Sequence, residues 1–147
     1  MYKNIYIFFT FLIFLVGCSN EKPRLGIKNF KLTPCPSSPN CVSTQSTDKK
    51  HFVEPITTQN SPQKTKKAIL KILRKLNQSK IIEIKDTYIR AEFSSKVFGF
   101  VDDVEFYFPN NKSNITTIHM RSASRLGYSD FGVNKKRIEE IRNKLKN

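Results

Sequence analysis

The chain has 147 residues, of which 38% are apolar and 12% aromatic. This length fits one small domain and excludes most multidomain machinery. The apolar content is too high for a disordered tail, and the presence of only 5 Gly and 7 Pro excludes collagen-like and low-complexity sequences. With 26 Lys and Arg against 12 Asp and Glu, the chain is strongly basic, which favours an anionic partner.

Residues 1–17 have the features of a bacterial lipoprotein signal peptide. Lys3 precedes an uncharged apolar run from Ile5 to Val16. A helix of this length covers about 18 Å, well short of the roughly 30 Å hydrocarbon core, so the run suits an export signal better than a membrane span. The sequence Leu-Val-Gly-Cys at 15–18 resembles the lipobox, in which the cysteine thiol receives a diacylglycerol before cleavage. We therefore expect cleavage before Cys18 and a lipid on its thiol; an ordinary secretory signal is the alternative.

A lipidated Cys18 would anchor the mature protein to the membrane of the cell envelope. Acyl chains such as palmitate contribute about 0.8 kcal/mol per buried methylene, so two or more give stable attachment without a transmembrane helix. Ser19 after the cysteine, in place of aspartate, favours the outer membrane, facing the periplasm, in a bacterium with two membranes. Residues 18–31, with Pro23, Gly26 and mixed charges, are expected to form a flexible lipidated tether.

If Cys18 carries lipid, Cys35 and Cys41 remain as a pair. An exported compartment is oxidising, and the intervening Pro-Ser-Ser-Pro-Asn can turn back on itself, so we predict a disulfide between them. In the loop-closure model so small a ring contributes about 2 to 2.5 kcal/mol. A metal site is the weaker alternative, because the chain has only His51 and His119 and no second cysteine pair. A catalytic thiol lacks a recognisable base, and no metal or cofactor is expected.

Residues 32–147 are predicted to form a single α+β domain. Ser61 followed by Pro62 is a typical helix start, and apolar residues then recur at helical spacing up to Leu76. A second helix is predicted at the C-terminus, where one stripe contains Val133, Ile138, Ile141 and Leu145. Between the two helices, alternating apolar residues predict four strands, which contain Ile82 and Ile84; Ile89, Ala91 and Phe93; Val104, Phe106 and Phe108; and Ile118 and Met120.

Short connections make these strands antiparallel neighbours, in a four-stranded antiparallel meander sheet. The two helices are expected to pack on its one apolar face, which leaves the other face free. A register with Phe106 opposite Ile118 gives the free face a set of charged groups: Asp103 opposite Arg121, Glu105 opposite His119, and Arg90 and Glu92 nearby. We expect a solvated surface of cross-strand pairs there.

The segment from residue 121 to residue 134 is the best candidate for a binding site. Forked guanidinium donors, hydroxyl groups and a helix N-terminus all favour an anion. The candidate anion-binding residues are Arg121, Ser122, Ser124, Arg125 and Asn134. A supporting acidic cluster would contain Asp102, Asp103, Glu105 and Asp130. The alternative is structural, because carboxylates can pair with the arginines, and Asp130 and Asn134 are natural turn and cap residues.

Three blocks of the sequence resemble domain-of-unknown-function family 1499. They are Leu32–Ser43, Phe100–Phe106, and Arg121–Asn134 followed by Arg137-Ile-Glu139. The resemblance extends to the C-terminus. It implies a small exported or organelle-lumen protein, often lipid-anchored, with no established activity. It also implies that the two cysteines, the acidic cluster and the candidate anion-binding residues form one neighbourhood.

The basic charge and the export signal favour a lipid-anchored, non-enzymatic module that binds an anionic ligand or partner near the membrane. The partner would be an anionic lipid, a polysaccharide or an envelope protein. Basic side chains near an anionic surface contribute about 1 kcal/mol each before screening, and seven lie between Lys64 and Lys80. Nucleic acid is not an expected partner, because the protein is exported and its strands lack alternating basic and aromatic residues.

The alternative is a hydrolase-like enzyme acting on a phosphate- or carboxylate-bearing substrate at the Asp/Arg/Ser cluster. Arg121 and Arg125 would form the clamp, and Asp102, Asp103 or Ser124 would act as acid, base or nucleophile. The sequence contains no Gly-x-Ser-x-Gly elbow, His-Glu-x-x-His, phosphate loop or dinucleotide fingerprint. We therefore expect a binding module and keep the enzyme as the second hypothesis.

Overall fold

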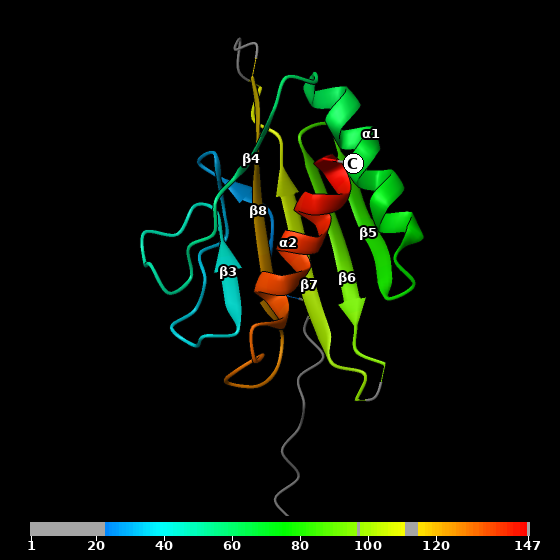
Figure 1. Cartoon of the computed structure of the whole chain (residues 1–147). Helices are drawn as coiled ribbons and strands as arrows, with labels where there is room; N and C mark the ends of the chain where they lie inside the picture. The colour runs from blue at the N-terminus through cyan, green and yellow to red at the C-terminus, as the bar shows by residue number, and fades with distance from the viewer. Residues whose placement is uncertain (1–22, 97, 111–114, 147) are drawn as a thin grey trace, which may run out of the picture.

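The computed structural model of the chain describes residues 23–96, 98–110 and 115–146. Figure 1 shows a twisted sheet with two helices, α1 (Pro62–Lys75) and α2 (Val133–Lys146), lying on one of its faces. The predicted α+β class, with two helices on one face, is confirmed. The predicted signal peptide and the lipidation site Cys18 lie outside the described residues.

The main sheet has six strands, so the predicted four-stranded meander is wrong in strand number. The four expected strands are present and adjacent in chain order: β5 (Ser79–Lys85), β6 (Tyr88–Ser94), β7 (Val101–Tyr107) and β8 (Thr116–Ser124). Two additional strands, β3 (Cys41–Ser43) and β4 (Ile56–Thr58), pair antiparallel with the two ends of β8. Strands of three residues are too short for an alternating pattern to reveal them.

Helix α1 begins at the residue that the sequence predicts. The Ser61 hydroxyl accepts a hydrogen bond from the Lys64 backbone N–H at 3.3 Å, and Pro62 occupies the first helical position. The apolar stripe of α1 is buried at Ile69, Ile72 and Leu73, and that of α2 at Ile138 and Ile141. Val133, which the sequence places on the α2 stripe, is instead exposed at the first residue of that helix.

The main core fills the space between the helices and the sheet. The residues predicted to face inward from β6, β7 and β8 are all buried there: Ile89, Ala91, Phe93, Val104, Phe106, Ile118 and Met120. Strand β5 differs, because a bulge between Ile81 and Glu83 interrupts the alternation of its side chains. Ile81 therefore packs against the core, while Ile84 is 47% exposed.

The register between β7 and β8 differs from the predicted one by two residues. Phe106 lies opposite Met120, not Ile118, and Glu105 therefore lies opposite Arg121. A shift of two residues keeps every side chain on its predicted face, so the predicted core is correct while the predicted charge partners are wrong. Hydrophobic alternation has a period of two, and it cannot distinguish registers that differ by two residues.

The sheet face opposite the helices is covered, although the sequence predicts a free face. Strands β1 (Ile27–Lys28) and β2 (Lys31–Leu32) form an antiparallel hairpin on this side (Figure 1). Leu32 packs with Tyr88 and Tyr107 in a second, smaller core. Part of the segment that the sequence assigns to a tether therefore lies against the sheet and shields the charged residues beneath it.

Candidate functional site

The sheet divides the candidate residues into two clusters on opposite faces. Successive side chains of a strand point to opposite faces, so Asp102 and Asp103 diverge, as do Arg121 and Ser122. The hairpin-face cluster contains Tyr88, Arg90, Glu92, Asp103, Glu105, Arg121 and Arg125. The helix-face cluster contains Asp102, Ser122, Ser124, Asn134 and Arg137, together with Asn40. The residues that the family resemblance groups into one neighbourhood therefore lie in two separate clusters.

Glu105 lies at the centre of the hairpin-face cluster and is fully buried. Its carboxylate accepts hydrogen bonds from the Tyr88 hydroxyl at 2.7 Å, the Gly26 backbone N–H at 2.9 Å and Arg121 Nη1 at 3.2 Å. Burial raises the pKa of the Glu105 carboxyl, although these three donors act in the opposite direction. Burial and the nearby carboxylate also raise the pKa of Tyr88, so its hydroxyl remains a donor.

Asp103 forms the second centre of this cluster, and it contacts two arginines. Arg90 Nη2 donates to Asp103 Oδ1 at 2.8 Å, and Arg125 Nε donates to Oδ2 at 2.7 Å. Arg125 also forms an ion pair with Glu92. Burial acts to raise the pKa of Asp103, but hydrogen bonds from Arg125 and Arg90 outweigh it and lower the pKa. The predicted pairing of Asp103 with Arg121 is therefore wrong.

His119 also has partners that differ from the prediction. It lies opposite Tyr107, not Glu105, and the two rings stack with centroids 6.0 Å apart. Its Nδ1 is 3.2 Å from the Thr44 hydroxyl. Burial lowers the pKa of His119, so the imidazole is neutral at neutral pH. A neutral ring in this position is a packing element of the sheet.

Asn134 organises the helix-face cluster from the first turn of α2, and it is fully buried. Its Nδ2 donates to the Asn40 carbonyl and to the Ser124 hydroxyl, both at 3.0 Å. Its Oδ1 accepts hydrogen bonds from the Ser122 hydroxyl and from Arg137 Nη1. Every polar group of the Asn134 side chain therefore has a protein partner, which supports the structural interpretation of this residue.

Arg137 is a member of this cluster that the sequence analysis did not select as a site residue. Its Nη2 donates to Asp102 Oδ2 at 2.7 Å, and its guanidinium lies 4.7 Å from the ring centroid of Phe93. The one signal for Arg137 was its place in the third block of the family resemblance, and no spacing rule links it to Asp102. Asp102 and Arg137 are 35 positions apart in the sequence, and only the tertiary fold brings them together.

The arrangement of these groups limits the chemistry that the clusters can perform. Arg121, Arg125 and Arg137 each contact a carboxylate of the protein, so each positive charge is already balanced. Ser124 lies on the helix face, whereas Asp103 and both arginines of the predicted clamp lie on the hairpin face. Within the described part of the chain, no group of three His, Cys, Asp or Glu side chains is arranged to hold a metal ion.

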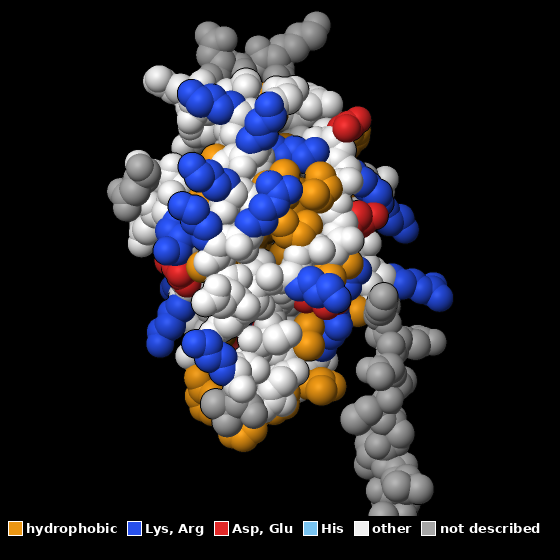
Figure 2. Space-filling view, turned by 90° about the vertical axis from the view of Figure 1, so that its right-hand side faces the viewer, with side chains coloured by type: hydrophobic (Ala, Val, Ile, Leu, Met, Phe, Trp, Pro, Cys, Tyr) orange, Lys and Arg blue, Asp and Glu red, His pale blue; other side chains and the backbone are white. Residues whose placement is uncertain are grey.

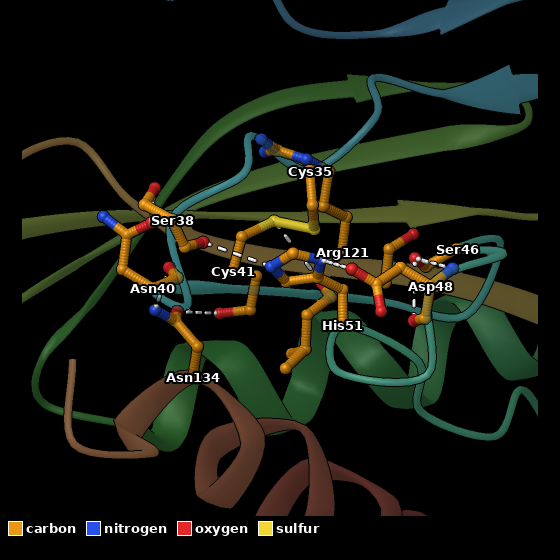
Figure 3. Close-up of a disulfide and its surroundings, with 12 residues drawn as sticks. Cys35, Ser38, Asn40, Cys41, Ser46, Asp48, His51, Arg121 and Asn134 are labelled. Carbon is orange, nitrogen blue, oxygen red and sulfur yellow. Dashed lines mark hydrogen bonds and ion pairs between the residues drawn. A yellow bond between two sulfur atoms is a disulfide. The ribbon is translucent and has the colours of Figure 1, made fainter. Parts of the chain in front are cut away.

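Cys35 and Cys41 form a disulfide that closes the loop leading into β3 (Figure 3). His51, for which the sequence predicts no structural role, holds this loop. Its Nε2 contacts the Ser38 carbonyl at 3.2 Å, and its Nδ1 lies 3.3 Å from Asp48. Figure 3 shows Arg121 beside the disulfide, so the loop forms part of the cover over the hairpin face.

A groove of about 680 Å³ lies between the β1–β2 hairpin and the disulfide loop. Its lining includes Lys28 and Lys31 of the hairpin, together with Cys35, Ser46 and His51. The sequence does not predict this groove, because its walls come from segments with the composition of a tether and of loops. Neither arginine of the predicted anion site lines it.

Exposed lysines lie along both helices. We define the helical basic surface as the exposed lysines of α1 and α2: Lys64, Lys67, Lys71, Lys75, Lys135, Lys136, Lys144 and Lys146. Helix α1 contains no acidic residue. Between the helices, Lys71, Lys75 and Lys144 line a groove of about 470 Å³. Figure 2 shows Lys and Arg side chains spread over the side of the molecule that carries α1.

The model of a protein family described as "Protein of unknown function (DUF1499)" matches residues 31–145, most of the chain. The chain belongs to the DUF1499 family. The DUF1499 region begins at β2 and ends within the last turn of α2, so it includes the disulfide and both charged clusters. No curated protein matches the chain. Among the described residues of this DUF1499 protein, no helix is both long and apolar enough to cross a membrane.

Proposed function

We propose that this DUF1499 protein is a lipid-anchored, non-enzymatic module of the cell envelope that binds an array of anionic groups through its helical basic surface. The observation that carries the proposal is the charge of α1. Lys64, Lys67, Lys71 and Lys75 are exposed on this helix, which has no acidic residue to balance them. Positive potential therefore extends from the surface, where a negatively charged partner can reach it.

The contrast with the buried arginines supports a surface role for the lysines. Arg121 pairs with Glu105, and Arg125 pairs with Asp103 and Glu92. The charges of both arginines are therefore balanced by carboxylates of the protein. Lys64, Lys67, Lys71 and Lys75 extend into solvent and keep their charge available for a partner. A hydrolase at the Asp/Arg/Ser cluster would need these groups to face one substrate, and the sheet separates them.

The sequence at the N-terminus supports attachment to a membrane. A lipid on Cys18 would keep the domain near the membrane surface, on the periplasmic side of the outer membrane if the bacterium has two membranes. Each lysine close to an anionic surface contributes about 1 kcal/mol before salt screening. Phosphate-rich lipid headgroups and soluble anionic polymers share the chemistry that this surface would recognise.

The proposal is tested with residues 19–147, made without the leader and checked for cooperative unfolding. We expect this protein to bind vesicles that contain phosphatidylglycerol and not to bind vesicles of phosphatidylcholine alone. The bound protein should dissociate from the vesicles as the salt concentration rises. A parallel titration with soluble polyphosphate shows whether the partner is a lipid surface or a free polymer. Equal partition onto both kinds of vesicle, with no binding of polyphosphate, would refute the proposal.

A further inference from the structure

Large hydrophobic side chains are exposed together at one end of the molecule. They lie on two loops, between β6 and β7 and between β8 and α2, which Figure 1 shows at the same end of the sheet. We define the apolar end as Phe98, Phe100, Leu126, Tyr128 and Phe131, each more than half exposed. The Arg125 backbone N–H donates to the Val101 carbonyl at 3.1 Å, which joins the bases of the two loops. Figure 2 shows hydrophobic side chains gathered at this lower end.

The loop before α2 is held in a shape that turns Phe131 outward. Phe131 is 91% exposed and has a φ of 52°, a left-handed conformation that is unusual for a bulky residue. The Asp130 carboxylate accepts hydrogen bonds from the backbone N–H groups of Gly132 at 3.0 Å and Asn134 at 2.8 Å. Asn40 Nδ2 donates to the Gly127 carbonyl at 2.6 Å. The fold therefore maintains the exposure of this aromatic ring by specific contacts.

Basic residues border the apolar end. A groove of about 330 Å³ lies between the first turns of α2 and the residues that follow α1, and Lys96, Val133 and Lys136 are among the residues that line it. Lys135 is exposed in the same turn of α2. The nearby carboxylate of Asp130 is engaged by backbone N–H groups. Aromatic and aliphatic side chains bordered by lysines are typical of surfaces that enter the headgroup region of an anionic bilayer.

We propose that the apolar end inserts into the interface of an anionic phospholipid bilayer and so fixes the orientation of the domain on its membrane. Phe98, Phe100 and Phe131 would lie at the boundary between headgroups and acyl chains, with Lys96 and Lys136 among the phosphates. The helices would then lie outside the bilayer, and most of the helical basic surface would be accessible to a partner. This inference depends neither on the binding activity of that surface nor on the lipid anchor.

The absence of Trp from the sequence allows a direct test. The full chain is recovered from the membranes of a bacterial host and reconstituted in vesicles of phosphatidylethanolamine and phosphatidylglycerol, carrying a single Phe131→Trp reporter. A matched control is Phe30→Trp, because Phe30 is 82% exposed and also has a positive φ, of 60°. Phe30 lies in the turn of the β1–β2 hairpin, which Figure 1 shows away from the apolar end.

We expect brominated acyl chains to quench the Phe131→Trp reporter several-fold more strongly than the Phe30→Trp reporter, and the emission of the former to shift to shorter wavelength in vesicles. A Phe98→Trp reporter on the other loop should behave like Phe131→Trp and serves as an independent measurement if the first variant fails to fold.

Equal quenching of the reporters on both ends would overturn the proposal, since the domain would then have no preferred orientation. A blue shift that depends on protein concentration and not on lipid would also overturn it, because a second copy of the chain would then cover this end. Binding of polyphosphate by the helices is unaffected by these outcomes, so the two proposals can fail separately.

Discussion

Glu105 and Arg121 lie opposite each other on β7 and β8, and their side chains form an ion pair of 3.2 Å that is almost completely shielded from water. The pair lies on the sheet face that the sequence predicts to be free. The N-terminal segment covers it, and the Gly26 backbone N–H donates a third hydrogen bond to the carboxylate, in addition to that of Tyr88. The buried Glu105 carboxylate therefore links the N-terminal segment to the sheet.

Replacement of Glu105 should strongly destabilise the fold. The variant Glu105→Gln leaves the Arg121 guanidinium buried without a counter-charge, and we expect the free energy of unfolding to fall by about 3 to 5 kcal/mol. Glu140→Gln is a matched control, because Glu140 pairs with Lys144 on the exposed side of α2. It should cost less than about 1 kcal/mol. Urea unfolding of both variants measures the difference, and similar losses would show that the buried pair has no special role.

Asp103 should make the protein sensitive to acid. Its pKa is lowered in the folded state below the ordinary value of 3.8, so the unfolded state takes up the proton first as the pH falls. The contribution of Asp103 to stability is therefore complete above its unfolded pKa and is lost as the pH falls through its folded pKa. Asp103→Asn should lower the melting temperature at neutral pH and flatten its decline below about pH 4. An acid decline as steep as that of the parent would contradict this role.

Removal of Asn134 should disrupt the helix-face cluster without changing any charge. Asn134→Ala leaves the Asn40 carbonyl and the Ser122 and Ser124 hydroxyls with one partner fewer in a buried site. We expect a loss of about 2 to 4 kcal/mol in the free energy of unfolding. Asn143→Ala, at an exposed position of the same helix, should change it by less than about 0.5 kcal/mol. If the two variants unfold at the same urea concentration, the cluster is not structural.

The disulfide should stabilise the domain, and reduction should remove this stabilisation. Replacing both Cys35 and Cys41 with Ala opens a short ring and should lower the free energy of unfolding by about 2 to 2.5 kcal/mol. The parent protein in dithiothreitol should then unfold at nearly the same urea concentration as the double variant. No effect of dithiothreitol on the parent, together with a stable double variant, would contradict the prediction.

The sequence was sufficient to predict the two helices and the inward residues of the central strands. Helix starts have local signals, such as Ser61 followed by Pro62, and the inward residues of β6 to β8 follow from alternation alone. The register between β7 and β8 was not predictable from that alternation, because a pairing of Phe106 with either Ile118 or Met120 buries the same side chains.

The candidate site was predicted less well, for two physical reasons. The segment that covers the hairpin face has the composition of a linker, and only tertiary contacts such as that of Gly26 with Glu105 give it a fixed place. The separation of the two clusters, by contrast, was available in the sequence. Asp102 and Asp103 are neighbours in a predicted strand, so their side chains had to point to opposite faces.

The central claim is that the helical basic surface binds anionic groups. It is tested most directly by comparing the removal of four lysines from α1 with the removal of four lysines elsewhere. One variant of residues 19–147 carries Lys→Gln at positions 64, 67, 71 and 75 of α1. A second variant carries Lys→Gln at positions 28, 31, 49 and 50, which are exposed elsewhere, so both variants have the same net charge. At about 1 kcal/mol per lysine before screening, we expect the first variant to lose at least about tenfold in affinity for polyphosphate, and the second to bind nearly as the parent does. Equal weakening of both variants would contradict the claim, because binding would then follow net charge and not this surface.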